Sequence, residues 1–258
     1  MYAPWIENIY LVVQSESQVP AWINREKVKV VLHADFIPEE VLPTYSAFSI
    51  EVFLHLIPGI SEQFLYFNDD MILTRPVVKE EFFLEKVPVH CLKSSVHTVT
   101  VTDGDYQCKE IACDDFMVPI KNAWKMATKA SGCNCSQVMM SDHGVYSFTK
   151  TINEECYNKI KDDLIASCTK VRSHKSVICW MYLYYAYLTN RLIVVGPRTK
   201  EVHFTEGELY HVISNIFNTT WQCVCINDRN ISNYDLAKEL TQDALFTRFN
   251  TPSKYENC

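Results

Sequence analysis

A short apolar run that stops at two adjacent carboxylates is the most constraining feature of this chain. Residues 64–70 read FLYFNDD, so the run ends in Asn68, Asp69 and Asp70. Such a run is typical of a buried strand, and an α/β sheet collects its ligands beyond the carboxyl ends of its strands. Paired carboxylates there suit a divalent cation, which in turn binds phosphate. A solvated turn after a strand explains this motif alone equally well, because Asn and Asp are common turn residues.

A second stretch near the other end of the chain has the same form. Residues 223–229 read CVCINDR, an apolar run that again stops at an Asn-Asp pair, Asn227 and Asp228. Two strand ends that each deliver Asn-Asp would converge on one site if both strands end at the same edge of a sheet. The repetition favours a functional site over two unrelated turns.

Composition narrows how such a site would hold phosphate. The chain has 258 residues, of which 48% are hydrophobic and 21% charged, enough for one large domain or two small ones. It has 6 glycines, and neither common Gly-rich phosphate-binding motif occurs in it. Phosphate would therefore be bound by side chains, a metal ion or helix N-termini.

Charge and hydropathy argue against several classes of protein. The net charge of −7 argues against nucleic acid as the main partner. The apolar stretches are far shorter than the ~20 residues of a membrane-spanning helix. Residues 1–10, MYAPWIENIY, lack the basic and apolar regions of a signal peptide. These features indicate an ordinary globular chain.

The chain is rich in cysteine, with 11 residues. None of the pairs has the C-x-x-C spacing of common zinc sites, so a structural zinc site is weakly supported. Cys223 and Cys225 alternate in an expected strand and are interpreted as core thiols on one side of it. Five others lie in a loop-rich middle and would form disulfides in an oxidising lumen: Cys91, Cys108, Cys113, Cys133 and Cys135. Sequons at Asn134, Asn218 and Asn230 mildly favour such a lumen.

The apolar patterns predict alternating strands and helices. Strands are expected at 8–13, 28–32, 64–67, 191–196 and 222–226, with a β-rich stretch at 96–102 and a turn at 103–105. Helices are expected over 46–57, within 117–130, and over 151–168, 176–189, 207–217 and 233–249. The helix at 176–189 is aromatic-rich and is expected in the core. The alternation predicts an α/β fold with a mixed, largely parallel sheet, in which 103–175 is an inserted helical subdomain.

Longer segments resemble a known family. Residues 33–73, HADFIPEEVLPTYSAFSIEVFLHLIPGISEQFLYFNDDMIL, closely resemble the second signature segment of the Stealth family. That family includes bacterial capsular polysaccharide phosphotransferases and the animal N-acetylglucosamine-1-phosphotransferase that tags lysosomal enzymes. Residues 141–150 and 170–177 look like its third segment, and residues 223–256 look like its fourth. The resemblance covers nearly the whole chain in order.

The resemblance implies a fold and an activity. It implies one catalytic domain over residues 1–258, with a glycosyltransferase-like fold that binds a nucleotide sugar, a UDP-sugar first of all. Such proteins transfer a sugar-1-phosphate to a hydroxyl of a glycan or glycoprotein acceptor, forming a phosphodiester and releasing a nucleoside monophosphate. The resemblance also implies Mg²⁺ or Mn²⁺ as cofactor, no nucleic-acid partner and a possible homo-oligomer.

The family's site residues can be placed on this sequence. Asp69, Asp70 and Asp228 would bind the metal or act in catalysis. His143 would serve as phosphate donor or general base, because histidine titrates near neutrality. Arg172 would bind phosphate oxygens with both arms of its guanidinium. The remaining matches are expected to bind substrate: His33, Asp35, Glu51, Asn68 and Asn227.

Each of these residues also has an ordinary structural interpretation. Without the resemblance, Glu51 is equally well a polar residue of a helix face, Arg172 a surface ion-pair partner and His143 a structural histidine. His55 follows Glu51 by one helical turn and is expected on the same face. The family's His-x-Pro is replaced by His143-Gly144-Val145.

The family's first segment, a strand reading roughly Tyr-Thr-Trp-Val-Asp-Gly, has no match here, so we expect an N-terminally incomplete domain. Two alternatives to the transferase therefore stay open. One is a metal-dependent glycosyltransferase that releases a nucleoside diphosphate, and the other is a non-catalytic binding or regulatory partner. The compartment also stays open: the secretory lumen if the chain is eukaryotic with an upstream anchor, and the cytoplasm if it is bacterial.

Overall fold

The computed structural model describes residues 2–98, 116–204, 209–228 and 233–257, with only the backbone described at 95–98, 204, 209 and 228. The strands are β1 (Ile9–Val13), β2 (Val28–Leu32), β3 (Gln63–Tyr66), β4 (Met71–Leu73), β5 (Phe83–Leu84), β6 (Val87–Thr98), β7 (Gln137–Ser141), β8 (Tyr146–Thr149), β9 (Ile193–Val195), β10 (Thr199–Phe204) and β11 (Cys223–Asp228). The α-helices are α1 (Ala47–Glu51), α2 (Met117–Ser131), α3 (Lys150–Ser167), α4 (Trp180–Leu188), α5 (Leu209–Phe217) and α6 (Tyr234–Arg248).

The strands form several small sheets that mix the two directions. β1 pairs with β2, β6 with β9, and β10 with β11 in parallel. β4 pairs with β11, β8 with β3, and β6 with both β5 and β7 in antiparallel fashion. This arrangement confirms the mixed α/β class expected from the alternation of strands and helices.

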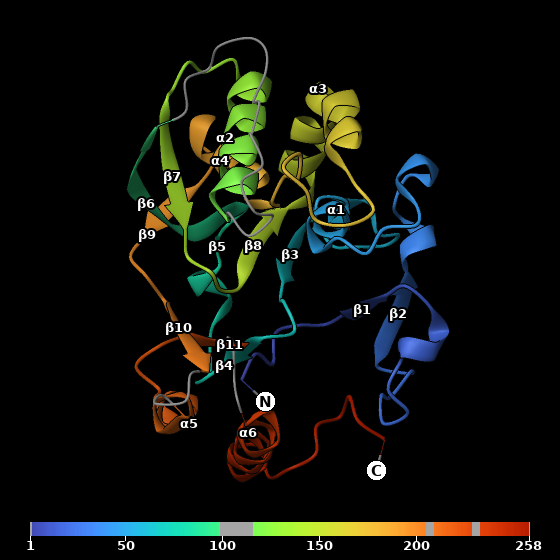
Figure 1. The fold of residues 1–258 in the computed structure, drawn as a ribbon, viewed down its shortest axis with the longest axis vertical. Helices are drawn as coiled ribbons and strands as arrows, with labels where there is room; N and C mark the ends of the chain where they lie inside the picture. The colour runs from blue at the N-terminus through green and yellow to red at the C-terminus, as the bar shows by residue number, and fades with distance from the viewer. Residues whose placement is uncertain (1, 99–115, 205–208, 229–232, 258) are drawn as a thin grey trace.

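Two hydrophobic cores hold these elements together. The larger core contains the inner faces of α2 and α3 and most of α4, whose residues Trp180 to Ala186 are all buried. The smaller core joins the sheet of β10 and β11 to α5 and α6 through Val202, Val212, Ile216 and Val224. In Figure 1, α2, α3 and α4 gather at one end of the molecule and α5 and α6 at the other. The expectation that the aromatic helix belongs to the core is confirmed.

The helix expected over 46–57 is shorter than its sequence pattern suggested. The α-helix ends at Glu51, and a 3₁₀ turn follows at Leu54–Leu56. Apolar residues on every side of this segment are buried, and a tightening turn buries Phe53 and Leu54 where one straight helix would expose a face. His55 therefore does not share the face of Glu51. Its ring lies between those of Tyr157 and Tyr182, at centroid distances of 5.2 Å from each.

The expected disulfides are wrong where they can be checked. Cys91, Cys133 and Cys135 are free thiols in the described part of the chain. Cys108 and Cys113, together with the turn at 103–105, lie outside the described residues. Cys223 and Cys225 are fully buried in β11, which confirms them as core thiols. None of the helices in the described ranges is both long and apolar enough to cross a membrane. The inserted subdomain at 103–175 stays a prediction.

The larger core predicts which tryptophan matters for stability. Trp124 is fully buried, donates its indole N–H to the Cys135 carbonyl at 2.9 Å, and packs edge-on against Tyr184. We expect Trp124→Ala to lower the free energy of unfolding by about 3–5 kcal/mol, because it leaves a large cavity and loses a hydrogen bond. Trp22, which is 58% exposed, is the matched control, and Trp22→Ala should cost less than about 0.5 kcal/mol. Urea denaturation measures both, and equal losses would contradict this account of the core.

Candidate active site

Strand register places the first Asn-Asp motif beside His143. β3 and β8 run antiparallel with Tyr66 opposite Tyr146. The residues that follow β3 therefore lie next to those that precede β8, and His143 comes three positions before Tyr146. This pairing of residues distant in sequence brings an imidazole to the carboxyl end of the FLYF strand.

The second Asn-Asp motif reaches the same place through β4. Cys225 in β11 lies opposite Met71 in β4, and the backbone N–H of Ile226 donates to the Asp70 carbonyl at 2.9 Å. The two motifs therefore converge, as the sequence suggested. We expected two parallel strands that end at the same edge of a sheet. Instead, β4 starts directly after Asp70 and joins the two motifs by pairing antiparallel with β11.

The Asp70 carboxylate lies at the centre of this convergence. Its Oδ2 accepts a hydrogen bond from the Cys225 thiol at 3.1 Å, and His143 Nε2 lies 3.7 Å from the same oxygen. Its Oδ1 is buried and has no hydrogen-bond partner among the described residues. Burial alone would raise the pKa of Asp70, but His143 and the thiol outweigh it and hold the pKa below its ordinary value. Asp70 is therefore a carboxylate at neutral pH.

His143 lies beside the Asp70 carboxylate, which favours the protonated form of its ring. Its Nδ1 lies 3.0 Å from the Tyr146 hydroxyl, and the Phe116 ring contacts it edge-on. Burial lowers the pKa of His143. The nearby carboxyl groups of Asp70, Glu201 and Glu51 raise it by more than burial lowers it, so the net change is upward. An imidazolium at this position would attract a phosphate oxygen.

Glu51 contributes a carboxyl of a different kind. It lies at the last turn of α1, is 6% exposed, and its Oε1 accepts the backbone N–H of Cys179 at 3.0 Å. Burial disfavours its charged form more than its hydrogen bonds favour it, which raises the pKa of Glu51 to about 7. A group that gains and loses a proton near neutrality suits acid–base chemistry.

One large cavity connects these groups. It has a volume of about 1950 Å³, and contiguous runs from β1 and from the β3 segment form two of its walls. Eight of the candidate site residues line it: His33, Glu51, Asn68, Asp69, Asp70, His143, Arg172 and Asn227. A fold that gathers these residues around one cavity is what a substrate site requires.

Two candidates are placed differently. Asp35 is exposed outside the cavity lining, and its Oδ2 accepts the backbone N–H of Leu32 at 2.8 Å, a local turn interaction. Asp228 ends β11 beside Asn227, but its side chain lies outside the described part of the structure. The roles of both residues stay predictions.

Arg172 is exposed, whereas His33 is buried. The Arg172 guanidinium is exposed to the cavity and stacks on the Phe48 ring, 4.7 Å from its centroid. Stacking fixes the plane of the guanidinium and leaves its N–H groups free to bind an anion. His33 is 9% exposed, and its Nδ1 has no hydrogen-bond partner within the described ranges; burial lowers its pKa, so it is neutral.

The sequence patterns did not predict several residues of the site. Three exposed lysines line the cavity and add positive charge to it: Lys79, Lys86 and Lys93. Asp142 accepts the backbone N–H groups of Arg198 at 2.9 Å and Thr199 at 2.8 Å, which ties the loop of His143 to β10. The position of Asp142 directly before His143 is the signal that would have marked it. Cys225 was interpreted only as a core thiol.

The donor set fits a hard divalent cation. The unpartnered Oδ1 of Asp70 and the exposed carboxylate of Asp69 line the cavity next to each other in sequence. Oxygen ligands of this kind suit Mg²⁺ or Mn²⁺. Asp70, His143 and Cys225 also place ligand atoms within 4.8 Å of one another. The Cys225 thiol donates to Asp70 Oδ2, and sulfur is a poor ligand for Mg²⁺ or Mn²⁺, which prefer oxygen.

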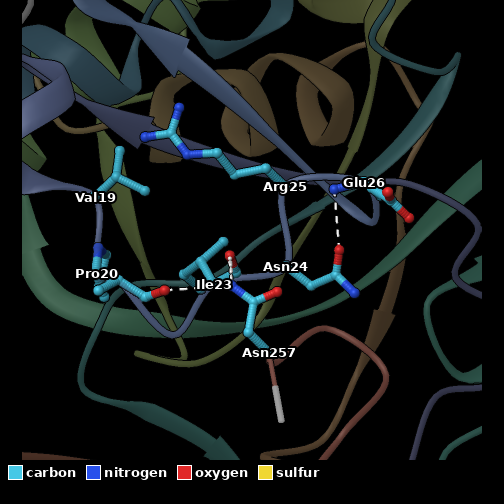
Figure 2. A pocket seen from close by; sticks show the side chains of 8 residues that line it. Val19, Pro20, Ile23, Asn24, Arg25, Glu26 and Asn257 are labelled. Carbon is cyan, nitrogen blue, oxygen red and sulfur yellow. Dashed lines mark hydrogen bonds between the residues drawn. The ribbon is translucent and has the colours of Figure 1, made fainter.

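A second, smaller cavity lies at the surface away from these residues. It measures about 500 Å³ and is lined by residues 19–26, except Trp22, together with Asn257. Figure 2 shows its side chains, with Asn257 held against the turn at Ile23 by a hydrogen bond of 2.9 Å. None of the candidate site residues lines it. It reflects how the C-terminal segment packs on this turn.

Comparison with known proteins shows which family region and which proteins the chain resembles. Residues 1–90 match the family described as Stealth protein CR2, conserved region 2. The exopolysaccharide phosphotransferase cps2G of Lactiplantibacillus plantarum is 29% identical over 262 residues, covering 90% of this chain and 74% of that protein. Over residues 1–90 the chain is therefore similar to conserved region 2 of the Stealth family. The match to region 2 agrees with the resemblance of residues 33–73 to the family's second segment.

Two further relatives show where the similarity is strongest. The receptor polysaccharide phosphotransferase WefC of Streptococcus gordonii is 28% identical over 247 residues, covering 88% of this chain and 74% of that protein. The exopolysaccharide phosphotransferase SCO2592 of Streptomyces coelicolor is 51% identical over 87 residues, covering 33% of this chain and 9% of that protein. Similarity to cps2G and WefC extends well beyond region 2, into the half of the chain that holds His143 and Arg172.

The close packing of Gly144 against Thr199 can be tested by substitution. A Cβ at Gly144 would overlap Oγ1 of Thr199 and lie 2.9 Å from its Cβ. Gly144→Ala should therefore destabilise the fold by about 1–3 kcal/mol, because overpacking displaces the loop of His143 from β10. Adding Thr199→Gly removes the obstructing atoms, so the double variant should recover most of the loss. Urea denaturation of the four proteins gives the coupling, and strictly additive effects would contradict it.

The raised pKa of Glu51 predicts how the stability of the protein changes with pH. The carboxyl titrates at its ordinary value of 4.5 when unfolded and at about 7 when folded. The folded protein therefore holds the extra proton between these pH values, and stability falls as the pH rises through that window. Glu51→Gln should remove this fall, which amounts to roughly 3 kcal/mol, while keeping an acceptor for the Cys179 N–H. Urea denaturation from pH 4 to pH 8 measures it, and parallel curves for both proteins would disprove the raised pKa.

Proposed function

We propose that this chain is a phosphotransferase that moves a sugar-1-phosphate from a nucleotide sugar to a hydroxyl of a polysaccharide. Relatives over most of its length are named polysaccharide phosphotransferases. The observation that carries the proposal is the pairing of the Asp70 carboxylate with the His143 imidazolium at a cavity that Glu51 and Arg172 also line. Such a set meets the demands of phosphoryl transfer, which are positioning and neutralisation of charge.

In this proposal the acceptor oxygen attacks the phosphorus that carries the sugar. The bond from that phosphorus to the bridging oxygen breaks, and a nucleoside monophosphate leaves. A divalent cation held by Asp69 and Asp70, with Asp228, would neutralise negative charge on the two phosphates. The His143 imidazolium and the Arg172 guanidinium bind oxygens of the transferred phosphate from the protein side.

The acceptor hydroxyl must lose its proton as it attacks. Glu51 is the group best suited to receive it, because it lines the cavity and its pKa is raised to about 7 by burial. Its hydrogen bond to the Cys179 N–H fixes the orientation of the carboxyl. Asn68 and Asn227 supply neutral hydrogen-bonding groups to the same cavity for the sugar or nucleotide.

The dimensions of the cavity suit this pair of substrates. Its volume of about 1950 Å³ exceeds that of an ordinary small-molecule site, so it has room for a nucleotide sugar and part of a glycan. The lining holds more carboxylates than cations, so a divalent cation together with Lys79, Lys86 and Lys93 would be needed to bind an anionic donor such as a UDP-sugar.

The released nucleotide tests the reaction directly. The purified chain is incubated with a UDP-sugar, an oligosaccharide acceptor and Mn²⁺, and the products are separated by anion-exchange chromatography. UMP in equal amount to a phosphodiester-linked product supports the proposal. UDP would instead identify a glycosyltransferase that breaks the sugar–phosphate bond. Failure of a panel of UDP-sugars to give either nucleotide would favour a binding or regulatory partner.

Asp70 should be indispensable for turnover. Asp70→Asn keeps the shape of the side chain but removes the charge that holds a cation and pairs with His143, so we expect kcat to fall at least about 1000-fold. Asp162, an exposed residue of α3, provides a matched Asp→Asn control that should leave kcat unchanged. Steady-state assays of UMP release measure both, and substantial activity in D70N would refute the assignment.

A further inference from the structure

The thiol of Cys225 lies in a hydrogen-bond chain that ends on Asp70. Cys225 is fully buried in β11 and donates its S–H to Asp70 Oδ2 at 3.1 Å. Behind it, the Asn227 side-chain amide donates to the Cys225 sulfur at 3.5 Å and to Glu201 Oε1 at 3.0 Å. The chain therefore runs from Glu201 through Asn227 and Cys225 to the carboxylate.

This chain makes the two oxygens of the carboxylate unequal. Oδ2 is occupied by the thiol and lies 3.7 Å from His143 Nε2. Oδ1 is buried without a partner in the described part of the chain. A buried carboxylate oxygen without a partner is costly, and a bound cation would remove that cost. The orientation of the Asp70 carboxylate decides which of its oxygens is left for such a cation to bind.

We propose that Cys225 is a positioning residue, whose thiol fixes the Asp70 carboxylate so that Oδ1 is presented to a divalent cation. It contacts the carboxylate and would touch neither the substrate nor the cation. The inference deepens the proposed function and rests on it only for the identity of the cation. Residues that hydrogen-bond a ligating carboxylate commonly govern metal affinity by one to two orders of magnitude.

The same strand provides a matched control. Cys223 lies two positions earlier in β11, so it faces the same side and is also fully buried. Its thiol contacts the Val224 carbonyl at 3.5 Å rather than the carboxylate. Substitution at Cys223 thus reproduces the loss of a buried thiol without touching the chain that ends on Asp70.

The experiment titrates Mn²⁺ alone into the full chain and follows free Mn²⁺ by electron paramagnetic resonance. Cys225→Ala and Cys225→Val both remove the donor, and we expect each to weaken Mn²⁺ binding at least 10-fold. Cys225→Ser restores a donor and should return the dissociation constant to within about 3-fold of the wild-type value. Cys223→Ala and Cys223→Val should leave it unchanged, although their melting temperatures fall as much as those of the Cys225 variants.

Unchanged Mn²⁺ affinity in the Cys225 variants would overturn the inference, as would equal weakening in the Cys223 variants. Absence of Mn²⁺ binding by the wild-type protein would overturn it too. Where Cys225→Ala fails to fold, Cys225→Val gives the decisive comparison, because it leaves no cavity. The readout is separate from turnover: a chain that binds Mn²⁺ as expected but releases no UMP would refute the transferase and leave the role of Cys225 standing.

Discussion

The short antiparallel pairing of β4 with β11 is the constraint on which the site depends. It sets Met71 opposite Cys225, and the backbone of Ile226 is bonded to that of Asp70. The partners in the Cys225–Asp70 contact are 155 positions apart in the chain. A slip of one residue in this register would turn Cys225 away from the carboxylate, because side chains alternate between the two faces of a strand. The smaller core packs α5 and α6 on β10 and β11 and so holds β11 in its sheet.

Burial acts on every ionisable group of the cavity, but its outcome depends on the partner. Asp70 and His143 face each other, so each favours the charged form of the other: the pKa of Asp70 is lowered and that of His143 is raised. Glu51 has mainly backbone and neutral hydrogen-bonding partners, and burial raises its pKa to about 7. The same low-dielectric surroundings thus keep one carboxylate charged and leave another ready to exchange a proton. This difference is what allows distinct roles for two carboxyls at one cavity.

Several features of the site followed from local sequence. An apolar run ending at Asn68-Asp69-Asp70 indicated a strand end with ligands, and the second Asn-Asp pair indicated convergence with it. The strand ends hold in the structure because they are short-range features, whereas the convergence comes from the long-range pairing of β4 with β11. The helix expected over 46–57 was too long, since periodicity alone does not show that every side of a segment will be buried. The disulfides expected at Cys91, Cys133 and Cys135 were wrong, because spacing does not reveal which thiols meet.

The sequence by itself determined the residue types, the mixed α/β class and the family resemblance. These depend on pattern and composition, which can be read along the chain. Only the tertiary structure decided which oxygen of Asp70 is free, that a thiol holds the other one, and that Asp35 serves a turn outside the cavity lining. The pKa of Glu51 likewise depends on burial by distant segments. Such properties arise from contacts between residues far apart in sequence, and they exist only once the strands have paired and water has been excluded.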